Sequence, residues 1–548
     1  MFGLKSAYLY LVALQVTLIK FLKKIYFSTN RYNKSLESKT PSQVRFNPNP
    51  FLLSIISPYT KKSFKINEIN LNDFWLEKKG EKLFEHHNFL WLSLIDRKID
   101  YKNIQKLIYL WMLKYSSFKK KVWETSTLST RIISWLLNID VIINNGTFEF
   151  KKKFFQNIIA QCNHLKKNIG FEKDPLKEME ILTALILSGV VFRDYEENHD
   201  IGIKALEKFV KYNFDKDGFP KTRSPNDLIF FTKYLLLCHE NIKDAQLYVP
   251  EFLDDILKKN LECMKFLQTP ENQVPFFNGA SENDINHYEK YFKDLKINKK
   301  ERKNTIGGIF FAKSKQQVVY FDIGGPPPKN FSRNYQSGPL SFEYFCDGTK
   351  IITNCGFGSS ISPKAELISR LTASQSTLTI NDTSITKFER NRLINRIFGN
   401  SIKNTFKTKE LILNNNDHRL GYSISHDGYE KDFGCIHKRE IYLDQENNKL
   451  VGIDHIFKKS DGIPVRYVFR FHLNPELSAV KTMSGSGALI QISKNKSLLF
   501  SVRNENVEVE KSVYLGGKKI LDNACITISG NLVNKDKSFN WEIKKNIK

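Results

Sequence analysis

The spacing of apolar residues changes once along the chain, and this change restricts the fold more than any other feature. Between about residues 80 and 270 apolar residues recur every three or four positions, which is typical of amphipathic helices. Beyond about residue 305 they alternate with polar residues, as in strands with one buried face. Residues 282–304, between the two regions, are highly charged. We therefore predict two domains of different class joined by a charged linker.

Turn signals divide each region into elements. Asn145-Gly146 and Asp174-Pro175 separate helices in the first region, and Asp347-Gly348 and Asp461-Gly462 separate strands in the second. Successive helical hairpins of this kind pack as a solenoid or toroid, and many short strands with almost no helix favour a β-sandwich. Helices are predicted over 103–115, 129–143, 154–168, 178–191, 204–212 and 228–238, and strands over 308–312, 317–322, 340–345, 350–354, 376–380, 439–443, 450–455, 466–473, 498–503 and 524–529.

The formal net charge is +26 over 548 residues. A surface this basic attracts nucleic acid, anionic lipid or acidic glycan, although a genomic bias toward Lys and Asn codons explains the charge equally well. The cations are dispersed, with short runs at 119–121 and 151–153 and no long basic arm. Because no helix-turn-helix, RNA-binding aromatic strand, KH loop or zinc finger is found, we expect no nucleic-acid partner.

Neither the cysteines nor the N-terminus fixes the cellular compartment. The seven cysteines are far apart and form no CxxC pair, which excludes a zinc ribbon and favours buried, unpaired thiols. Near the N-terminus, residues 6–24 combine an apolar run with Lys20, Lys23 and Lys24. The run is short for a membrane span. An amphipathic helix resting on the domain or weakly on a membrane is preferred to a signal-like segment.

A collinear series of short motifs resembles the heparinase II/III-like family, in particular its alphaproteobacterial-type members. No single motif is specific, but their order and spacing match from about residue 80 to the C-terminus. The series comprises FEHHNFLWL (84–92), RIISWL (131–136), DGFPKTRSP (217–225), VPFFNG (274–279), FDIGGPPP (321–328), QSGPLSFEY (336–344), IITNCG (351–356), RLTASQSTLTI (370–380), HDGYEKDFGCIHKREIYL (426–443), RFHLNPE (470–476) and SVYLGG (512–517).

The resemblance implies a multidomain α+β fold, with an N-terminal α-helical toroid (an incomplete α/α barrel) followed by an antiparallel β-sandwich. The corresponding domains are an N-terminal segment at 1–75, the toroid at 76–281, the linker at 282–304 and the sandwich at 305–548. The resemblance also implies a lyase that cleaves uronic-acid polysaccharides by β-elimination in the cell envelope or periplasm. Such a reaction needs cations or hydrogen-bond donors to stabilise the dianion that forms and a side chain that removes the proton next to the carboxylate.

The sequence departs from the family at its most informative positions. Leu176 and Lys177 occupy the place of an Asn-His pair in a toroid helix, and Pro220 replaces a histidine of a loop. Some members bind a metal in the sandwich, and the matching positions here are Gln336, Asn354 and Gln375. Amides are poor zinc ligands compared with imidazole and carboxylate, so we expect no metal and no other cofactor. The three amides are expected to satisfy one another by hydrogen bonding.

The remaining candidate residues each have a structural alternative. Tyr335 is the predicted acid or base, or else a packed aromatic, and Asn278 is a predicted hydrogen-bond donor, or else a turn residue. Arg333 is predicted to act with them, and Arg223 to bind a carboxylate; either could be an ordinary surface arginine. Asn334, Gln336, Gln375 and His437 complete the predicted substrate site, with a core role open for His437 and His472. Glu343 is either structural or a cleft carboxylate, and His86, His87 and His164 are expected to be structural.

Two functions remain open from sequence alone. One is an active lyase with a rearranged Tyr/Arg/Asn site, and the other is a catalytically inactive relative that binds acidic polysaccharide in the same place. The loss of the histidines favours binding without catalysis, whereas the variety of bases within the family favours an altered mechanism. We lean toward the lyase. The sequence leaves the oligomeric state open.

Overall fold

The protein was analysed as a computed structural model that describes residues 2–58, 73–75, 81–96, 101–294, 304–412, 419–459, 464–533 and 536–546. Contacts divide the chain into two compact units. The helical unit contains residues 1–213 and 229–258, and the sandwich unit contains residues 214–228 and 259–548. Two segments that we predicted to lie in the toroid domain, 214–228 and 259–281, therefore pack with the sandwich. Part of the predicted linker forms the short helix α12 (Glu289–Asp294), and residues 295–303 lie outside the described residues.

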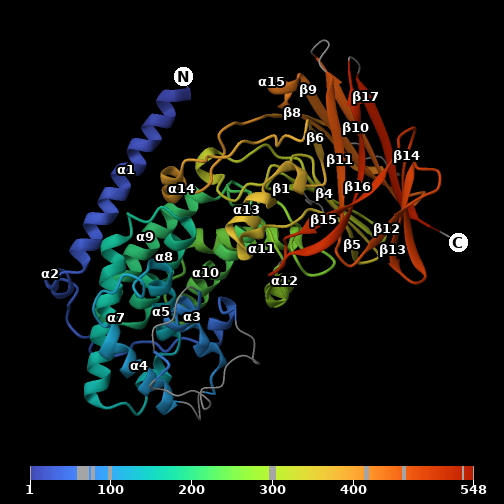
Figure 1. The fold of residues 1–548 in the computed structure, drawn as a ribbon. Helices are drawn as coiled ribbons and strands as arrows, with labels where there is room; N and C mark the ends of the chain where they lie inside the picture. Colours follow the sequence, from blue (N-terminus) through green and yellow to red (C-terminus); the bar gives the residue numbers. More distant parts are fainter. Residues whose placement is uncertain are drawn as a thin grey trace. The chain divides into compact units, whose positions relative to one another are not determined.

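The helical unit is a toroid of antiparallel helices (Figure 1). Capping residues begin its central helices: Glu124 accepts backbone hydrogen bonds at the start of α5, Thr147 does so for α7, and Asp174 for α8. The helix bounds are α1 (Phe2–Phe27), α2 (Asn30–Lys34), α3 (Glu81–His87), α4 (Tyr101–Tyr115), α5 (Thr125–Leu137), α6 (Ile139–Ile143), α7 (Phe148–Asn168), α8 (Pro175–Val191), α9 (Glu196–Asn213), α10 (Pro225–Asp244) and α11 (Glu251–Leu267), of which the last two cross the unit boundary.

The helical core is closely packed and contains one buried arginine. Helices α8 and α9 approach so closely that a Cβ atom on Gly189 would lie 2.3 Å from the backbone nitrogen of His199. The Arg131 guanidinium is completely buried. It donates to Gln161 and to the carbonyls of His87 and Val122, and it lies 4.5 Å from the Trp111 ring centroid. The amide and carbonyl oxygens and the ring face therefore stabilise the buried cation in place of a carboxylate.

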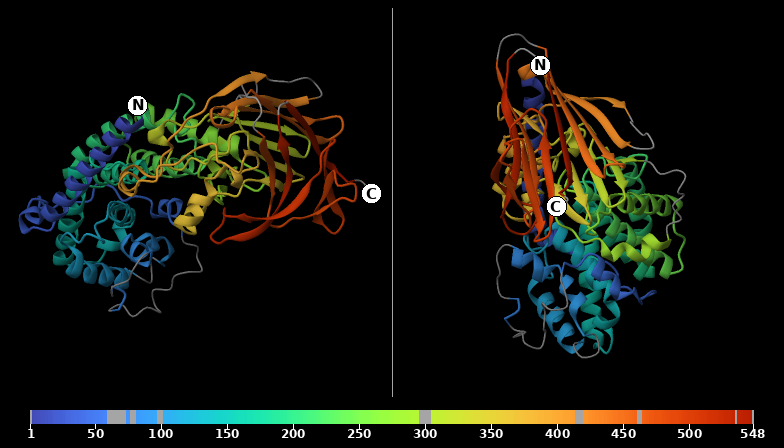
Figure 2. Two further views of the ribbon diagram at one scale, coloured as in Figure 1. Left: turned by 45° about the horizontal axis from the view of Figure 1, so that its top comes forward. Right: turned by 90° about the vertical axis from the view of Figure 1, so that its right-hand side faces the viewer.

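The sandwich unit consists of two antiparallel sheets (Figure 2). One has the strand order β1-β2-β3-β4-β5-β11-β16-β15, with β6 also paired to β11, and the other has the order β12-β13-β14-β17-β10-β9-β8-β7. The strand bounds are β1 (Thr305–Ile306), β2 (Ile309–Ser314), β3 (Gln317–Asp322), β4 (Phe342–Cys346), β5 (Thr349–Thr353), β6 (Leu378–Ile380), β7 (Thr408–Ile412), β8 (Arg419–Tyr429), β9 (Cys435–Asp444), β10 (Lys449–Lys458), β11 (Val465–Leu473), β12 (Ser478–Lys481), β13 (Gly487–Ser493), β14 (Lys496–Val502), β15 (Glu508–Tyr514), β16 (Leu521–Leu532) and β17 (Lys537–Lys545), and the short helices of this unit besides α12 are α13 (Pro363–Ser369), α14 (Arg392–Phe398) and α15 (Glu430–Phe433).

The inner faces of the two sheets form one apolar core, in which Phe342 stacks on Trp541 and Phe471 packs edge-on against the same ring. The seven cysteines are buried and free, which confirms that they act as small apolar residues. Within the described residues, no helix is long and apolar enough to cross a membrane. The predicted fold class, a helical toroid followed by an antiparallel sandwich, is confirmed.

Candidate functional site

The predicted site lies in the sandwich unit, where the Asn278-Gly279 turn packs against the segment from Asn334 to Gln336. Asn278 and Gly279 both have left-handed backbones, with φ values of 49° and 91°. A Cβ atom on Gly279 would lie 2.7 Å from the Cβ of Asn334, so only glycine fits there. The Gly279 backbone nitrogen donates to Oε1 of Gln336 over 3.0 Å. This turn therefore brings Asn278 next to three other predicted residues.

The three amides expected at the lost metal site are buried, but they bind the backbone and not one another. Gln336 donates from Nε2 to the carbonyls of Gly356 and Ser369, and Gln375 donates to the same Ser369 carbonyl over 2.8 Å. Asn354 donates to the Phe276 carbonyl and accepts from the Ser376 nitrogen. The predicted mutual hydrogen bonding is therefore wrong, since main-chain groups supply the partners.

These residues do not fit a metal ion. The oxygens of Gln336 and Asn354 already accept backbone hydrogen bonds, and neutral amides are weak ligands for zinc. Across the described parts of the chain, no group of three or more His, Cys, Asp or Glu side chains has metal-binding geometry. No chemical step is therefore assigned to a metal here.

Tyr335 is fully buried, and its hydroxyl has no hydrogen-bond partner. Burial raises the pKa of this phenol far above its usual value. The backbone of the segment is held by Arg370, which donates from Nε to the Tyr335 carbonyl over 2.9 Å and from Nη2 to the Ser332 carbonyl over 3.1 Å. Tyr335 is thus a neutral donor in an apolar setting, and a substrate could reach it only if residues near it move.

Arg223 makes a structural ion pair in this unit. Its guanidinium lies 2.5 Å from Asp322 at the end of β3, and it also donates to the carbonyls of Gly307, Gly308 and Gly325. The Arg223 side chain is 12% exposed and that of Asp322 is 2% exposed. These partners occupy most of the guanidinium donors, so the geometry indicates that Arg223 fastens the 214–228 segment to the sandwich.

Three predicted residues still present polar groups suited to a ligand. Arg333 is exposed and Asn334 is partly exposed. Asn278 is 1% exposed, and its Nδ2 donor has no hydrogen-bond partner. A buried donor without a partner is unfavourable, and it is a common feature of groups that bind a ligand. Arg333 and Tyr335 flank Asn334, which lies against the Gly279 turn, and Asn278 and Tyr335 each carry a buried donor.

The prediction that His437 binds substrate needs correction. His437 is fully buried between the sheets, where Nε2 lies 2.7 Å from Asp454 and Nδ1 lies 3.3 Å from His426. Asp454 also accepts from Arg439 and Trp541. Because its backbone position on β9 directs its side chain into the core, His437 cannot contact a substrate. The neighbouring cations lower the pKa of Asp454, which keeps this carboxylate charged.

Two other residues that the sequence left open are structural. Glu343 is fully buried and forms an ion pair with Lys350 at 3.2 Å. The Lys350 ammonium also lies 3.8 Å from the centroid of the Phe276 ring. His472 is 2% exposed, with Nε2 bonded to the Ala373 carbonyl. Burial lowers the pKa of His472 to about 4, so it is neutral at physiological pH.

In the helical unit, Glu180 is a perturbed carboxyl that the sequence analysis did not select. It lies on α8, is 5% exposed and accepts from the Tyr234 hydroxyl over 3.2 Å. Burial raises its pKa to about 8. One turn earlier, Lys177 forms an ion pair with Glu124. A carboxyl that titrates near neutral pH is a candidate for proton transfer, and its signal in the sequence is a lone acid within the apolar run 179–191.

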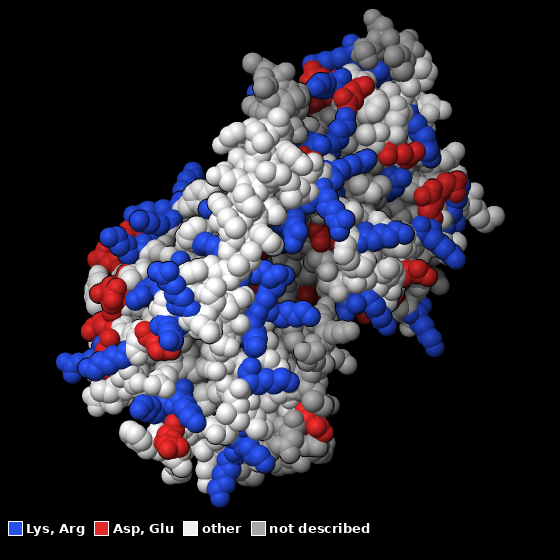
Figure 3. Space-filling model, turned by 60° about the vertical axis from the view of Figure 1, so that its left-hand side comes forward, with Lys and Arg blue, Asp and Glu red and all other residues white. Residues whose placement is uncertain are grey.

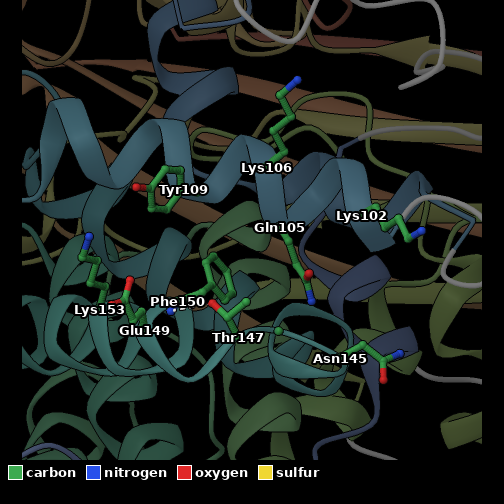
Figure 4. A pocket seen from close by; sticks show the side chains of 10 residues that line it. Lys102, Gln105, Lys106, Tyr109, Asn145, Thr147, Glu149, Phe150 and Lys153 are labelled. Atoms are coloured by element: carbon green, nitrogen blue, oxygen red, sulfur yellow. Dashed lines mark hydrogen bonds between the residues drawn. The ribbon is translucent and has the colours of Figure 1, made fainter.

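A basic pocket of about 390 Å³ lies between α4 and the start of α7 in the same unit (Figure 4). Lys102, Lys106 and Lys153 line it together with the ring of Tyr109 and one carboxylate, Glu149. In Figure 4 the lysine ammonium groups point in different directions and do not converge on one point. Figure 3 likewise shows Lys and Arg side chains scattered over the visible face with fewer acidic ones between them.

Comparison with solved structures finds the same fold in several heparinases. A helical toroid with an antiparallel sandwich is also found in heparan sulfate lyase HepC from Pedobacter heparinus, with a TM-score of 0.63, 15% identity and coverage of 90% of this chain and 82% of that one. The heparinase III product of BT4657 has a TM-score of 0.68 and 13% identity, with coverage of 96% of this chain and 88% of that one. A further heparinase III structure has a TM-score of 0.66 and 14% identity, with coverage of 97% of this chain and 91% of that one. At these identities the likeness establishes the fold alone.

Residues 302–542 match the model of the heparinase II/III-like C-terminal domain. This match covers the sandwich region and supports the resemblance to the heparinase II/III-like family. No curated protein sequence matches it significantly.

Proposed function

We propose that this protein is a lyase that cleaves uronic-acid-containing acidic polysaccharides by β-elimination. The observation that carries the proposal is the likeness of fold to heparan sulfate lyase HepC and to heparinase III structures, which extends over 90–97% of the chain. The net charge of +26 fits a polyanionic substrate.

The predicted residues of the sandwich unit suit three parts of this reaction: binding the carboxylate, stabilising the negative charge that develops, and transferring a proton. In our proposal Arg333 binds the uronate carboxylate, and the Asn278 amide donates to it as negative charge develops. Tyr335 acts in turn as base and acid: once its segment opens, the phenol releases its proton to solvent, the phenolate removes the proton next to the uronate carboxylate, and the phenol formed in this way protonates the leaving glycosidic oxygen. Asn334, Gln336 and Gln375 shape the same surface. This scheme requires the segment around Tyr335 to open when the substrate binds, because its hydroxyl is buried.

Binding without catalysis is the second candidate, and the same burial supports it. The Tyr335 hydroxyl is inaccessible in the described structure, and Gln336 and Asn354 stand where some relatives carry metal ligands. A protein of this kind would retain glycan in the cleft of its fold and leave the glycosidic bond intact.

The experiment that separates the two is incubation of the protein with heparan sulfate, chondroitin sulfate, hyaluronan and alginate while the ultraviolet absorbance of the unsaturated uronate product is followed. We expect the absorbance to rise with one of these glycans. Tyr335→Phe should abolish the increase, and Arg333→Ala should strongly lower its rate. Arg503→Ala, a matched change at an exposed arginine elsewhere in the sandwich unit, should keep full activity. Calorimetric binding to a glycan with no rise in absorbance would establish the second candidate.

We also propose that the protein works in the cell envelope or periplasm, where acidic polysaccharide is available. Fractionation of the host cells followed by immunoblotting tests this directly. Recovery with the cytoplasmic fraction would contradict it.

A further inference from the structure

The long N-terminal helix α1 presents to solvent a largely apolar face, which includes one polar residue, Gln15. Its large side chains are more than half exposed at Tyr8, Leu11, Leu18, Leu22 and Ile25. The spacing of these residues places them on one stripe of a helix, and at 1.5 Å per residue the stripe is about 25 Å long. Isolated exposed apolar residues are ordinary, but a largely apolar stripe of this length marks an interaction surface.

The opposite face of α1 holds the helix to its own unit. Ala13 is fully buried, and the Lys23 ammonium donates to Asn168 on α7 and lies over the ring of Phe171. At the end of the helix Phe27 packs against the His164 ring, with centroids 5.0 Å apart. Figure 1 shows α1 at the margin of the helical unit, and the exposed residues of the stripe lie on the side of the helix away from these contacts.

The charges around the stripe identify what covers it. The first acidic residue of the chain is Glu37. Before it the sequence carries only cations, at Lys5, Lys20, Lys23, Lys24, Arg31 and Lys34. A second copy of this helix would bring these like charges together, which costs energy, whereas an anionic lipid surface attracts them. Tyrosine rings such as those of Tyr8, Tyr10 and Tyr26 suit the boundary between headgroups and acyl chains.

We propose that α1 anchors the protein to an anionic membrane surface by lying in the interface with its apolar stripe toward the lipid. A helix held along one side and apolar along the other binds parallel to the surface, in the manner of interfacial amphipathic helices. The anchor concerns where the protein works and does not depend on the proposed lyase activity.

The test is flotation of the full-length protein with vesicles of phosphatidylcholine and phosphatidylserine mixed three to one, and with vesicles of phosphatidylcholine alone. We expect the protein to float with the mixed vesicles and much less with the neutral ones. The triple variant Leu11→Glu, Leu18→Glu, Leu22→Glu should lower the partition coefficient at least about a hundredfold, because three leucines no longer enter the lipid.

A matched triple variant controls for added charge and for folding. Leu113→Glu, Tyr212→Glu and Tyr248→Glu change residues that are 63%, 60% and 74% exposed elsewhere in the helical unit, and this variant should float like the parent. Circular dichroism should show both triple variants folded. Absence of flotation for the parent, or equal flotation of the α1 variant, would overturn the proposal. Sedimentation showing a dimer that the α1 variant dissociates, without vesicle binding, would assign the stripe to self-association and would also overturn it.

Discussion

The buried carboxyl of Glu180 should make the stability of the helical unit depend on pH. Burial raises its pKa from the usual value of about 4.5 to about 8. Between these two values the unfolded chain has released the proton and the folded chain still holds it. Unfolding therefore releases a proton, and stability falls as pH rises from about 4.5 to about 8. At pH 7 this difference costs on the order of 3 kcal/mol of unfolding free energy.

Glu180→Gln should remove this cost, because a neutral amide has nearly the same shape and can still accept from Tyr234. We expect the variant to match the parent near pH 4 and to exceed its unfolding free energy by on the order of 3 kcal/mol at pH 7. Urea unfolding followed by circular dichroism at a series of pH values measures the difference. Because proteins of this size can unfold in more than one transition, the transition of the helical unit should be fitted separately.

Glu197→Gln is the matched control, since Glu197 lies on α9 with a side chain that is 75% exposed. It should leave the pH dependence unchanged. A Glu180→Gln protein whose stability follows pH as the parent does would refute the inference that Glu180 is protonated in the folded state at pH 7. A loss of stability at every pH would show that the carboxylate is needed in its charged form.

Four further outcomes follow from the sandwich unit. Tyr335→Phe should change the unfolding free energy by less than about 1 kcal/mol, since the hydroxyl makes no hydrogen bond; a large loss in urea unfolding would show that it has a partner. Asp454→Asn should cost about 3–5 kcal/mol by the same assay, because Arg439 would remain buried without its counter-charge, and a loss below about 1 kcal/mol would contradict this. Gly279→Ala should lower the melting temperature and weaken glycan binding in calorimetry, given its φ of 91° and the crowding by Asn334; an unchanged protein would contradict the close approach. EDTA should leave the melting temperature unchanged, and a drop on chelation would reveal a bound metal.

The helices and strands that could be predicted are those in which the apolar residues have one regular spacing and form a single buried face. The predicted helix over 154–168 is the second half of α7, and the strand predicted over 317–322 coincides with β3. The helix predicted over 129–143 is in fact two helices that meet at Asn138, whose side chain binds the Ser134 carbonyl and replaces the regular hydrogen bonding there. α11 (Glu251–Leu267) was missed although its apolar residues have a helical spacing.

Among the strands that were not predicted, β15 and β17 have mostly polar side chains. β15 reads EVEKSVY and is largely exposed, and β17 reads KSFNWEIKK, where only Phe539, Trp541 and Ile543 face the core. Such strands are specified by pairing with their neighbours: β15 pairs with β16, the next strand along the chain, and β17 pairs with β10 and β14, which are more distant in sequence. A local pattern carries little of that information.

The site was predictable as a neighbourhood but not in its chemistry. The motifs correctly brought Asn278, Asn334 and Gln336 together, because family motifs preserve which loops meet. Burial depends on tertiary packing, and it decides the rest: Tyr335 and His437 point into cores, and Glu180 gains its raised pKa from surroundings contributed by other helices. No spacing along the chain reports these surroundings.

The replacement of possible metal ligands by amides has a physical consequence for the loops around them. Gln336 links the backbones at Gly279, Gly356 and Ser369, and Asn354 links those at Phe276 and Ser376. An imidazole or carboxylate in these places would change charge with pH, and without a metal it would leave buried groups unsatisfied. Amides do not titrate, and they both donate and accept. The hydrogen bonds of these amides are therefore expected to be independent of pH and of metal supply, so a pH dependence of activity would arise from other groups, such as the Tyr335 phenol.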